Sequence, residues 1–286
     1  MKGELRQRGD QVPAAIIFTN QKGGVGKTTL CRNTGCQLAA KGWKVLLIDA
    51  DGQGNLTKSF TDKEVPGLYE AVTGGVVHFH KVREGLDLLT GSKKLSLLEK
   101  ELASEIDGYT RLTELMKREE FIGYDLVFID SPPSLGMLTV NGLAAAEYLV
   151  IPMNASLFSM QGTNDLLETV GKVTKTFNPA LSLLGVVLNT YDRVPVISRQ
   201  IAGEIQESFD GVMFKTVIHK SIKIEEASAL QCGVNELTGN GTEKIRSEIE
   251  ALSEELIVRL RREDALARDR ETAEKPVFGD LTHARR

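Results

Sequence analysis

The stretch "TNQKGGVGKTTL", Thr19–Leu30, decides the fold of this chain. It nearly fits the phosphate-loop pattern G-x-x-x-x-G-K-[ST], because "GKT" at 26–28 fills the last three positions. Gln21 stands where the pattern has its first glycine, and Lys22 follows it as a second lysine before Lys27. Since one lysine is enough to neutralise the β- and γ-phosphates of a nucleotide, the second lysine needs its own explanation.

The residues on either side of the glycines supply the context that a phosphate loop requires. The apolar run 14–20 predicts a strand before the loop, and 27–41 predicts a helix after it. Glycines without a Cβ let backbone N–H groups converge on phosphate oxygens, and the helix N-terminus adds its dipole. We therefore expect ATP to contact Gly23, Gly24, Val25, Gly26, Lys27, Thr28 and Thr29.

Short apolar runs alternate with longer helical patterns along the chain. Strands are predicted at 14–20, 44–51, 86–92, 124–131, 146–154, 183–192 and 211–218. Helices are predicted at 27–41, 95–120, 135–147, 159–177, 197–209 and 242–262. Several strands are apolar without alternation, which is typical of strands covered on both faces. The pattern predicts an α/β fold with a mostly parallel twisted sheet and helices on both faces.

Composition limits the class of protein. The chain has 286 residues, 41% of them hydrophobic and 26% charged, which is ordinary for a globular protein. Its three cysteines lack C-x-x-C spacing, so we expect a reduced, cytoplasmic protein rather than a disulfide framework or a zinc site. The net charge is −4, so any nucleic-acid binding must come from a local basic patch.

The same patterns predict one main domain. Residues 1–13 form a short N-terminal extension without an apolar segment, and 14–262 form the nucleotide-binding domain. After 262 the apolar period stops, and 263–286 mixes both charges with few large apolar residues. We interpret that last segment as a mobile charged tail.

Carboxylates follow two predicted strands at the edge where the phosphate loop lies. Asp130 ends 124–131 and is placed to accept a hydrogen bond from Mg²⁺-bound water, while Thr28 offers its hydroxyl to the ion. Asp49 and Asp51 end the strand after the loop helix. A carboxylate there could orient the attacking water or contact Mg²⁺, or it could only shape the turn that follows.

Four blocks resemble the ParA-type partition ATPases, which belong to the deviant Walker A group of phosphate-loop NTPases that also contains MinD. They are "KGGVGKTT", "IDADGQGNLT", "DLVFIDSPPSLGMLTVNGLAAAEYLVIPMN" and "VVLNTYDR". The resemblance implies an ATP-sandwich homodimer in which Lys22 reaches the phosphates bound by the partner. It further implies that Asp51 acts in hydrolysis and at Mg²⁺, that Asp130 is the Walker B carboxylate, and that Asn189 meets adenine.

The resemblance also implies partners. In this family, basic residues near the dimer rim bind DNA nonspecifically, and a ParB-like protein stimulates hydrolysis during plasmid or chromosome partition, so the protein would be nucleoid-associated. The candidates for DNA contact are Arg193, Arg199, Lys215, Lys220 and Lys223, which could alternatively form an ordinary solvated rim. Two family prolines are replaced, by Gly52 and by His219.

Two alternatives stay open within the group. One is a ParA-like ATPase that positions a protein cargo on the nucleoid. The other is a MinD-like positioning ATPase with a terminal amphipathic helix on the membrane. The apolar residues of 242–262 fall at helical spacing and are better interpreted as packed on the domain, so we expect no membrane contact.

Overall fold

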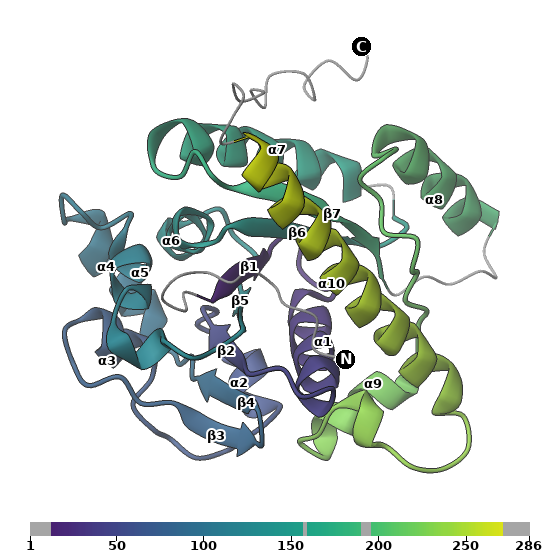
Figure 1. Ribbon diagram of the computed structural model, residues 1–286, viewed down its shortest axis with the longest axis horizontal. Helices are drawn as coiled ribbons and strands as arrows, with labels where there is room; N and C mark the ends of the chain where they lie inside the picture. Colours follow the sequence, from purple (N-terminus) through teal and green to yellow (C-terminus); the bar gives the residue numbers. More distant parts are fainter. Residues whose placement is uncertain (1–12, 157–158, 190–195, 271–286) are drawn as a thin grey trace.

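A computed structural model describes residues 13–156, 159–189 and 196–270 of the chain, which form a seven-stranded sheet with helices on both faces (Figure 1). The strand order is β3-β4-β2-β5-β1-β6-β7. Only β3 runs antiparallel to its neighbour, so the predicted α/β fold is confirmed. The strands are β1 (Ala14–Phe18), β2 (Val45–Asp49), β3 (His80–Arg83), β4 (Leu86–Leu89), β5 (Leu126–Asp130), β6 (Tyr148–Met153) and β7 (Ser182–Leu188).

Helices α1 to α7 lie between strands in the chain, and α8 to α10 follow the last strand. They are α1 (Lys27–Ala40), α2 (Asn55–Lys58), α3 (Leu68–Val72), α4 (Leu95–Ala103), α5 (Arg111–Met116), α6 (Met137–Ala145), α7 (Ser159–Thr176), α8 (Val196–Ser208), α9 (Ile222–Ala229) and α10 (Glu243–Arg270). Short 3₁₀ turns occur at Glu119–Phe121 and Val234–Glu236. Helix α10 lies alongside α1 across one face of the sheet (Figure 1).

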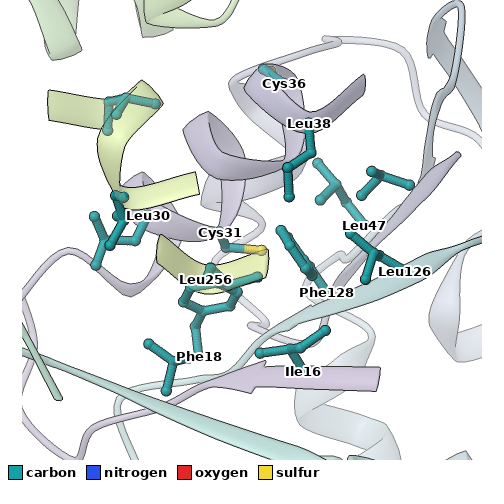
Figure 2. Close-up of a cluster of buried hydrophobic side chains, with 14 of the residues drawn as sticks. Ile16, Phe18, Leu30, Cys31, Cys36, Leu38, Leu47, Leu126, Phe128 and Leu256 are labelled. Carbon is teal, nitrogen blue, oxygen red and sulfur yellow. The ribbon is translucent and has the colours of Figure 1, made fainter. Parts of the chain in front are cut away.

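Successive residues of β1 build two separate cores. Ile16 and Phe18 point into a cluster with side chains of α1 and α10, among them Leu30 and Leu256 (Figure 2). Ile17 points to the opposite cluster, under α3 to α8. This alternation explains why the central strands are apolar throughout, because both of their faces are buried.

One predicted strand is not formed. Segment 211–218 makes a single parallel bridge, between Met213 and Val186, beside β7. The guanidinium of Arg259 donates hydrogen bonds to the carbonyl oxygens of Leu184 and Val212, at 3.0 and 3.1 Å. The Val212 carbonyl oxygen still accepts from Val186 N–H, but the N–H of Thr216 donates to Glu255 Oε2 of α10, at 2.9 Å, instead of to β7, so the pairing does not extend into a ladder.

Other boundaries also differ from the prediction. The predicted helix 95–120 is broken into α4, α5 and a 3₁₀ turn, because the chain turns tightly at Gly108. A Cβ on Gly108 would lie 1.9 Å from the Leu102 carbonyl oxygen, so no other residue fits that turn. The edge strand β3 was not predicted, and its side chains are only half-buried or exposed.

Helix α10 continues to Arg270, so the tail boundary predicted at 262 is wrong. Asp264 is buried, and its Oδ1 accepts a hydrogen bond of 2.8 Å from the hydroxyl of Tyr148 at the start of β6. The helix residues expected to pack on the domain do so, since Ile249, Leu252, Leu256 and Leu260 are all buried. Within the described ranges, no helix is long and apolar enough to cross a membrane.

The Tyr148–Asp264 hydrogen bond predicts a measurable contribution to stability. Replacing Asp264→Ala deprives a buried hydroxyl of this acceptor, which costs about 1–3 kcal/mol. Urea denaturation should show that loss for Asp264→Ala and almost none for Arg262→Ala, an exposed position of the same helix. Equal midpoints for the two variants would show that the end of α10 does not contribute to the fold.

Candidate nucleotide site

The predicted phosphate-site residues meet at one edge of the sheet. Strands β1, β2 and β5 are parallel neighbours, and their registers align Phe18 and Asp49 with Asp130. The loop 19–26 leaves β1 at this edge and leads directly into α1. The central strands therefore deliver the loop and the carboxylates to the same place, at the carboxyl ends where open α/β sheets bind ligands.

Glycines shape the loop, and Asn189 supports it from behind. Gly24 and Gly26 have positive φ angles of 72° and 93°, which side chains rarely adopt. A Cβ on Gly26 would lie 1.8 Å from Asn189 Nδ2. That amide, which follows β7, donates a 2.8 Å hydrogen bond to the carbonyl oxygen of Val25. The end of β7 thus fixes the backbone of the loop.

Lys27 lies inside the loop. Its Nζ donates hydrogen bonds to the carbonyl oxygens of Asn20, at 3.0 Å, and Lys22, at 3.3 Å. Burial lowers the pKa of Lys27, and the charges of Asp130 and Asp51 oppose that shift. A buried ammonium at the N-terminus of a helix, among convergent N–H groups, is placed to bind phosphate oxygens.

Thr28 and Asp130 fit a magnesium site. The Thr28 hydroxyl donates a 2.7 Å hydrogen bond to Asp130 Oδ2, while Asp130 Oδ1 is buried without a hydrogen-bond partner among the described residues. Burial raises the pKa of Asp130 well above its ordinary value, and the charge of Asp49 adds to the shift. A buried carboxylate oxygen beside a hydroxyl suits Mg²⁺, a hard cation that takes oxygen ligands and retains water.

The two aspartates at the end of β2, Asp49 and Asp51, have different surroundings. Asp49 Oδ2 accepts hydrogen bonds from the backbone N–H and hydroxyl of Thr57, at 2.8 and 2.6 Å, and burial raises the pKa of Asp49 to about 6. Asp51 lies nearer the surface, and its Oδ1 accepts a 2.9 Å hydrogen bond from Gln53 N–H. Asp49 therefore holds the turn into α2, whereas Asp51 Oδ2 accepts no hydrogen bond from the described residues.

Lys22 extends away from the loop interior. Its Nζ donates hydrogen bonds to Asn154 Oδ1, at 3.3 Å, and to Ser156 Oγ, both of which follow β6. Asn20 positions it, because Asn20 Oδ1 accepts from Lys22 N–H at 3.0 Å and its amide donates to the carbonyl oxygen of Pro152. Our sequence reasoning missed these polar neighbours, although they follow the ends of adjacent strands.

The predicted basic patch is only partly described. Lys215 and Lys220 are exposed, and Lys223 makes an ion pair of 2.7 Å with Glu226. Arg193 lies outside the described residues, and Arg199 is in α8 with its side chain outside them. The structure therefore places three of the five candidates close together in the chain, around the start of α9.

The two positions where family prolines are replaced have structural neighbours. His219 Nδ1 lies 2.7 Å from Glu248 Oε1, and its backbone N–H donates to Glu248 Oε2 at 2.9 Å. The histidine thus joins this segment to α10. A Cβ on Gly52 would lie 3.1 Å from the hydroxyl of Ser96, so the glycine lets α4 pack closely against the loop after Asp51.

A parallel sheet that carries a glycine loop, a buried lysine and carboxylates on its carboxyl edge defines a phosphate-loop nucleotide hydrolase. The family model described as "AAA domain" matches residues 14–183. The chain is 38% identical over 216 residues to the chromosome-partitioning ATPase Soj of Thermus thermophilus, covering 74% of this chain and 83% of that protein. It is 37% identical over 221 residues to the chromosome partitioning protein ParA of Caulobacter vibrioides, covering 74% and 82%.

Solved structures agree with these sequence relatives. Apo McdA of Cyanothece matches with a TM-score of 0.75 and 26% identity, covering 85% of this chain and 99% of that one. Cobyrinic acid a,c-diamide synthase of Mycobacterium smegmatis, with an ATP analogue and magnesium, matches with a TM-score of 0.70 and 26% identity, covering 93% and 98%. The chain belongs to the ParA-type partition ATPases of the deviant Walker A group, and it is an ATP hydrolase that uses ATP and Mg²⁺.

The contact between Gly26 and Asn189 yields a prediction. Gly26→Ala places a Cβ at a positive φ and against a buried amide, so it should lower the thermal midpoint by several degrees and weaken ATP binding. Gly23→Ala is the matched control, because a Cβ on Gly23 meets no atom within 4 Å. Differential scanning fluorimetry without nucleotide compares the two variants. Equal midpoints would contradict the tight fit at Gly26.

Proposed function

We propose that this ATPase cycles between a monomer and an ATP-sandwich dimer that binds DNA nonspecifically and partitions a plasmid or chromosome with a ParB-like partner. The observation that carries the proposal is the placement of the two lysines. Lys27 is buried inside the loop, whereas the Lys22 ammonium lies outside it at the end of β6. One subunit thus has a cation for its own nucleotide and a second cation at the edge of the sheet.

The residues of one subunit divide the work on ATP. The loop glycines and Lys27 bind the phosphates, and Asn189, whose amide donates to the Val25 carbonyl oxygen, supports the loop and is the candidate for contact with adenine. Thr28 and Asp130 hold Mg²⁺, which when bound offsets phosphate charge during transfer. Asp51 orients the attacking water, because its Oδ2 has no hydrogen bond with the described residues and the carboxylate borders Lys27.

Lys22 completes the site of the partner. A cation supplied by the second subunit contributes only when the triphosphate and the dimer exist together, so nucleotide state controls assembly. The same ammonium offsets charge that develops on the phosphates during hydrolysis, as a finger supplied in trans does. Dimerisation and catalysis therefore depend on one side chain.

DNA binding in this proposal relies on the basic residues around α9, with Arg193 and Arg199 as further candidates. Lys215 and Lys220 are exposed, and a dimer doubles them. Such lysines contact phosphates independently of sequence. The relatives named as chromosome-partitioning proteins support this use of the ATPase cycle.

The central test uses Asp51→Ala. This variant should bind ATP and dimerise but not hydrolyse it, because the loop, Lys27 and the magnesium residues remain. Analytical ultracentrifugation should show an ATP-dependent dimer that persists, and a phosphate-release assay should show at least a hundredfold lower rate, on the scale of lost general-base catalysis of about 10²–10⁴. A variant that stays monomeric with ATP, or hydrolyses it at the wild-type rate, would contradict the proposal.

A second test concerns DNA. Reversing charge with Lys220→Glu and Lys223→Glu should weaken DNA binding without changing ATP affinity, and the parent's affinity should fall steeply with salt because counterions are released. Fluorescence anisotropy on two unrelated duplexes measures both effects. Lys63→Glu, which changes an exposed lysine in the loop between α2 and α3, is the matched control. Sequence-specific or salt-independent binding would overturn this part.

A further inference from the structure

The side chains that hold Lys22 are more than neighbours of the nucleotide site. Asn154 and Ser156 follow β6, the strand that pairs with β1, so they lie beside the beginning of the phosphate loop. A tight turn, with Ser156 N–H donating to the Asn154 carbonyl oxygen at 2.8 Å, brings their side chains together. The Ser156 hydroxyl also donates to Asn154 Oδ1 at 3.0 Å. The two oxygens thus face one ammonium.

We infer that Asn154 and Ser156 form an intramolecular dock that holds Lys22 in the monomer and must release it before Lys22 can reach the nucleotide of a second subunit. This inference rests on the proposed function and adds a regulatory pair to it. The ammonium has three donors, and the Lys22 dock, meaning Asn154 and Ser156, accepts two of them. Contact with a partner's phosphates exchanges these hydrogen bonds for stronger ones to anionic oxygens.

The loop itself connects the dock to nucleotide binding. Lys27 Nζ donates a hydrogen bond to the Lys22 carbonyl oxygen, and Asn20 Oδ1 accepts one from Lys22 N–H. In the docked state, both ends of residue 22 are therefore held, the backbone by Asn20 and Lys27 and the side chain by the dock. Phosphate oxygens compete for the Lys27 ammonium, which frees the Lys22 carbonyl oxygen and loosens this residue. ATP binding and release of Lys22 are thereby linked within one subunit.

The dock sets a threshold for assembly. If docking outweighs release by about 1.4 kcal/mol, only about one Lys22 in ten is available, and the apparent dimer affinity falls by that fraction. A symmetric dimer opens two docks, so the combined effect reaches about a hundredfold. Removing the dock should therefore tighten ATP-dependent dimerisation, which is the opposite of what loss of a favourable interface contact would do.

The dock is tested first in the nucleotide-free monomer. Trace acetylation with acetic anhydride, followed by mass spectrometry, reports how available the Lys22 amine is, with exposed Lys63 as the internal reference. Asn154→Ala/Ser156→Ala should raise the acetylation rate of Lys22 severalfold relative to Lys63. Thr169→Ala, a half-buried position on α7 whose hydroxyl donates to the Asp165 carbonyl oxygen of its own helix, is the control and should leave the ratio unchanged. An unchanged Lys22 rate in the double variant would overturn the dock.

The coupling is tested in the Asp51→Ala background, where turnover is blocked. Sedimentation with ATP should show that the double dock variant dimerises at least about tenfold more tightly, and that the gain disappears when Lys22→Ala is also present. Equal or weaker dimerisation, or a gain that persists without Lys22, would overturn the regulatory role. A parent that never dimerises with ATP would overturn the proposed function together with this role, while the acetylation result would still decide whether the dock exists.

Discussion

The burial of one cation beside acidic groups organises this molecule. The Lys27 ammonium is removed from water, which is costly unless it is hydrogen-bonded and balanced by charge. Backbone carbonyl oxygens of the loop provide the hydrogen bonds, and Asp130 and Asp51 provide the charge. That balance requires strands β1, β2 and β5 to end at one level, which a parallel sheet achieves. The buried lysine is therefore stable only where the loop and the carboxylates are both present at the same edge of the sheet.

Much of the fold follows from patterns that the sequence states directly. The apolar strands and the "GKT" of 26–28 predict the sheet and place the loop, because each depends on local chemistry and a fixed period. The failures have tertiary causes. Segment 211–218 has a strand composition, yet the N–H groups of Lys215 and Thr216 donate to Glu255 of α10 instead of to β7. The end of α10 looks like a charged tail, yet Asp264 is buried against Tyr148. In both cases the interacting residues are far apart in the sequence, so a local pattern could not reveal the contact.

The site shows the same division. The spacing of the motif is enough to predict the loop glycines, Lys27 and Thr28, and Asp130 is predicted from its place at a strand end. The different surroundings of Asp49 and Asp51 depend on Thr57, which donates two hydrogen bonds to Asp49 and none to Asp51. The Thr57 hydroxyl also accepts a hydrogen bond from the N–H of Gly91, after β4, so the segment that carries Asp51 is fastened to the next strand. The surroundings of Lys22 were missed as well: Asn154 ends a predicted strand, but no motif links it or Ser156 to a lysine that lies far away in the sequence.

The central claim is that Lys22 acts on the nucleotide of another subunit, and a mixing experiment tests it most directly. A Lys22→Ala subunit retains its own phosphate loop but lacks the trans cation, and a Lys27→Ala subunit cannot hold ATP but still carries Lys22. Each variant alone should be nearly inactive, and their mixture should form one complete site per heterodimer. ATP turnover by the mixture well above the sum of the two is the predicted result. A mixture no more active than that sum would contradict the account.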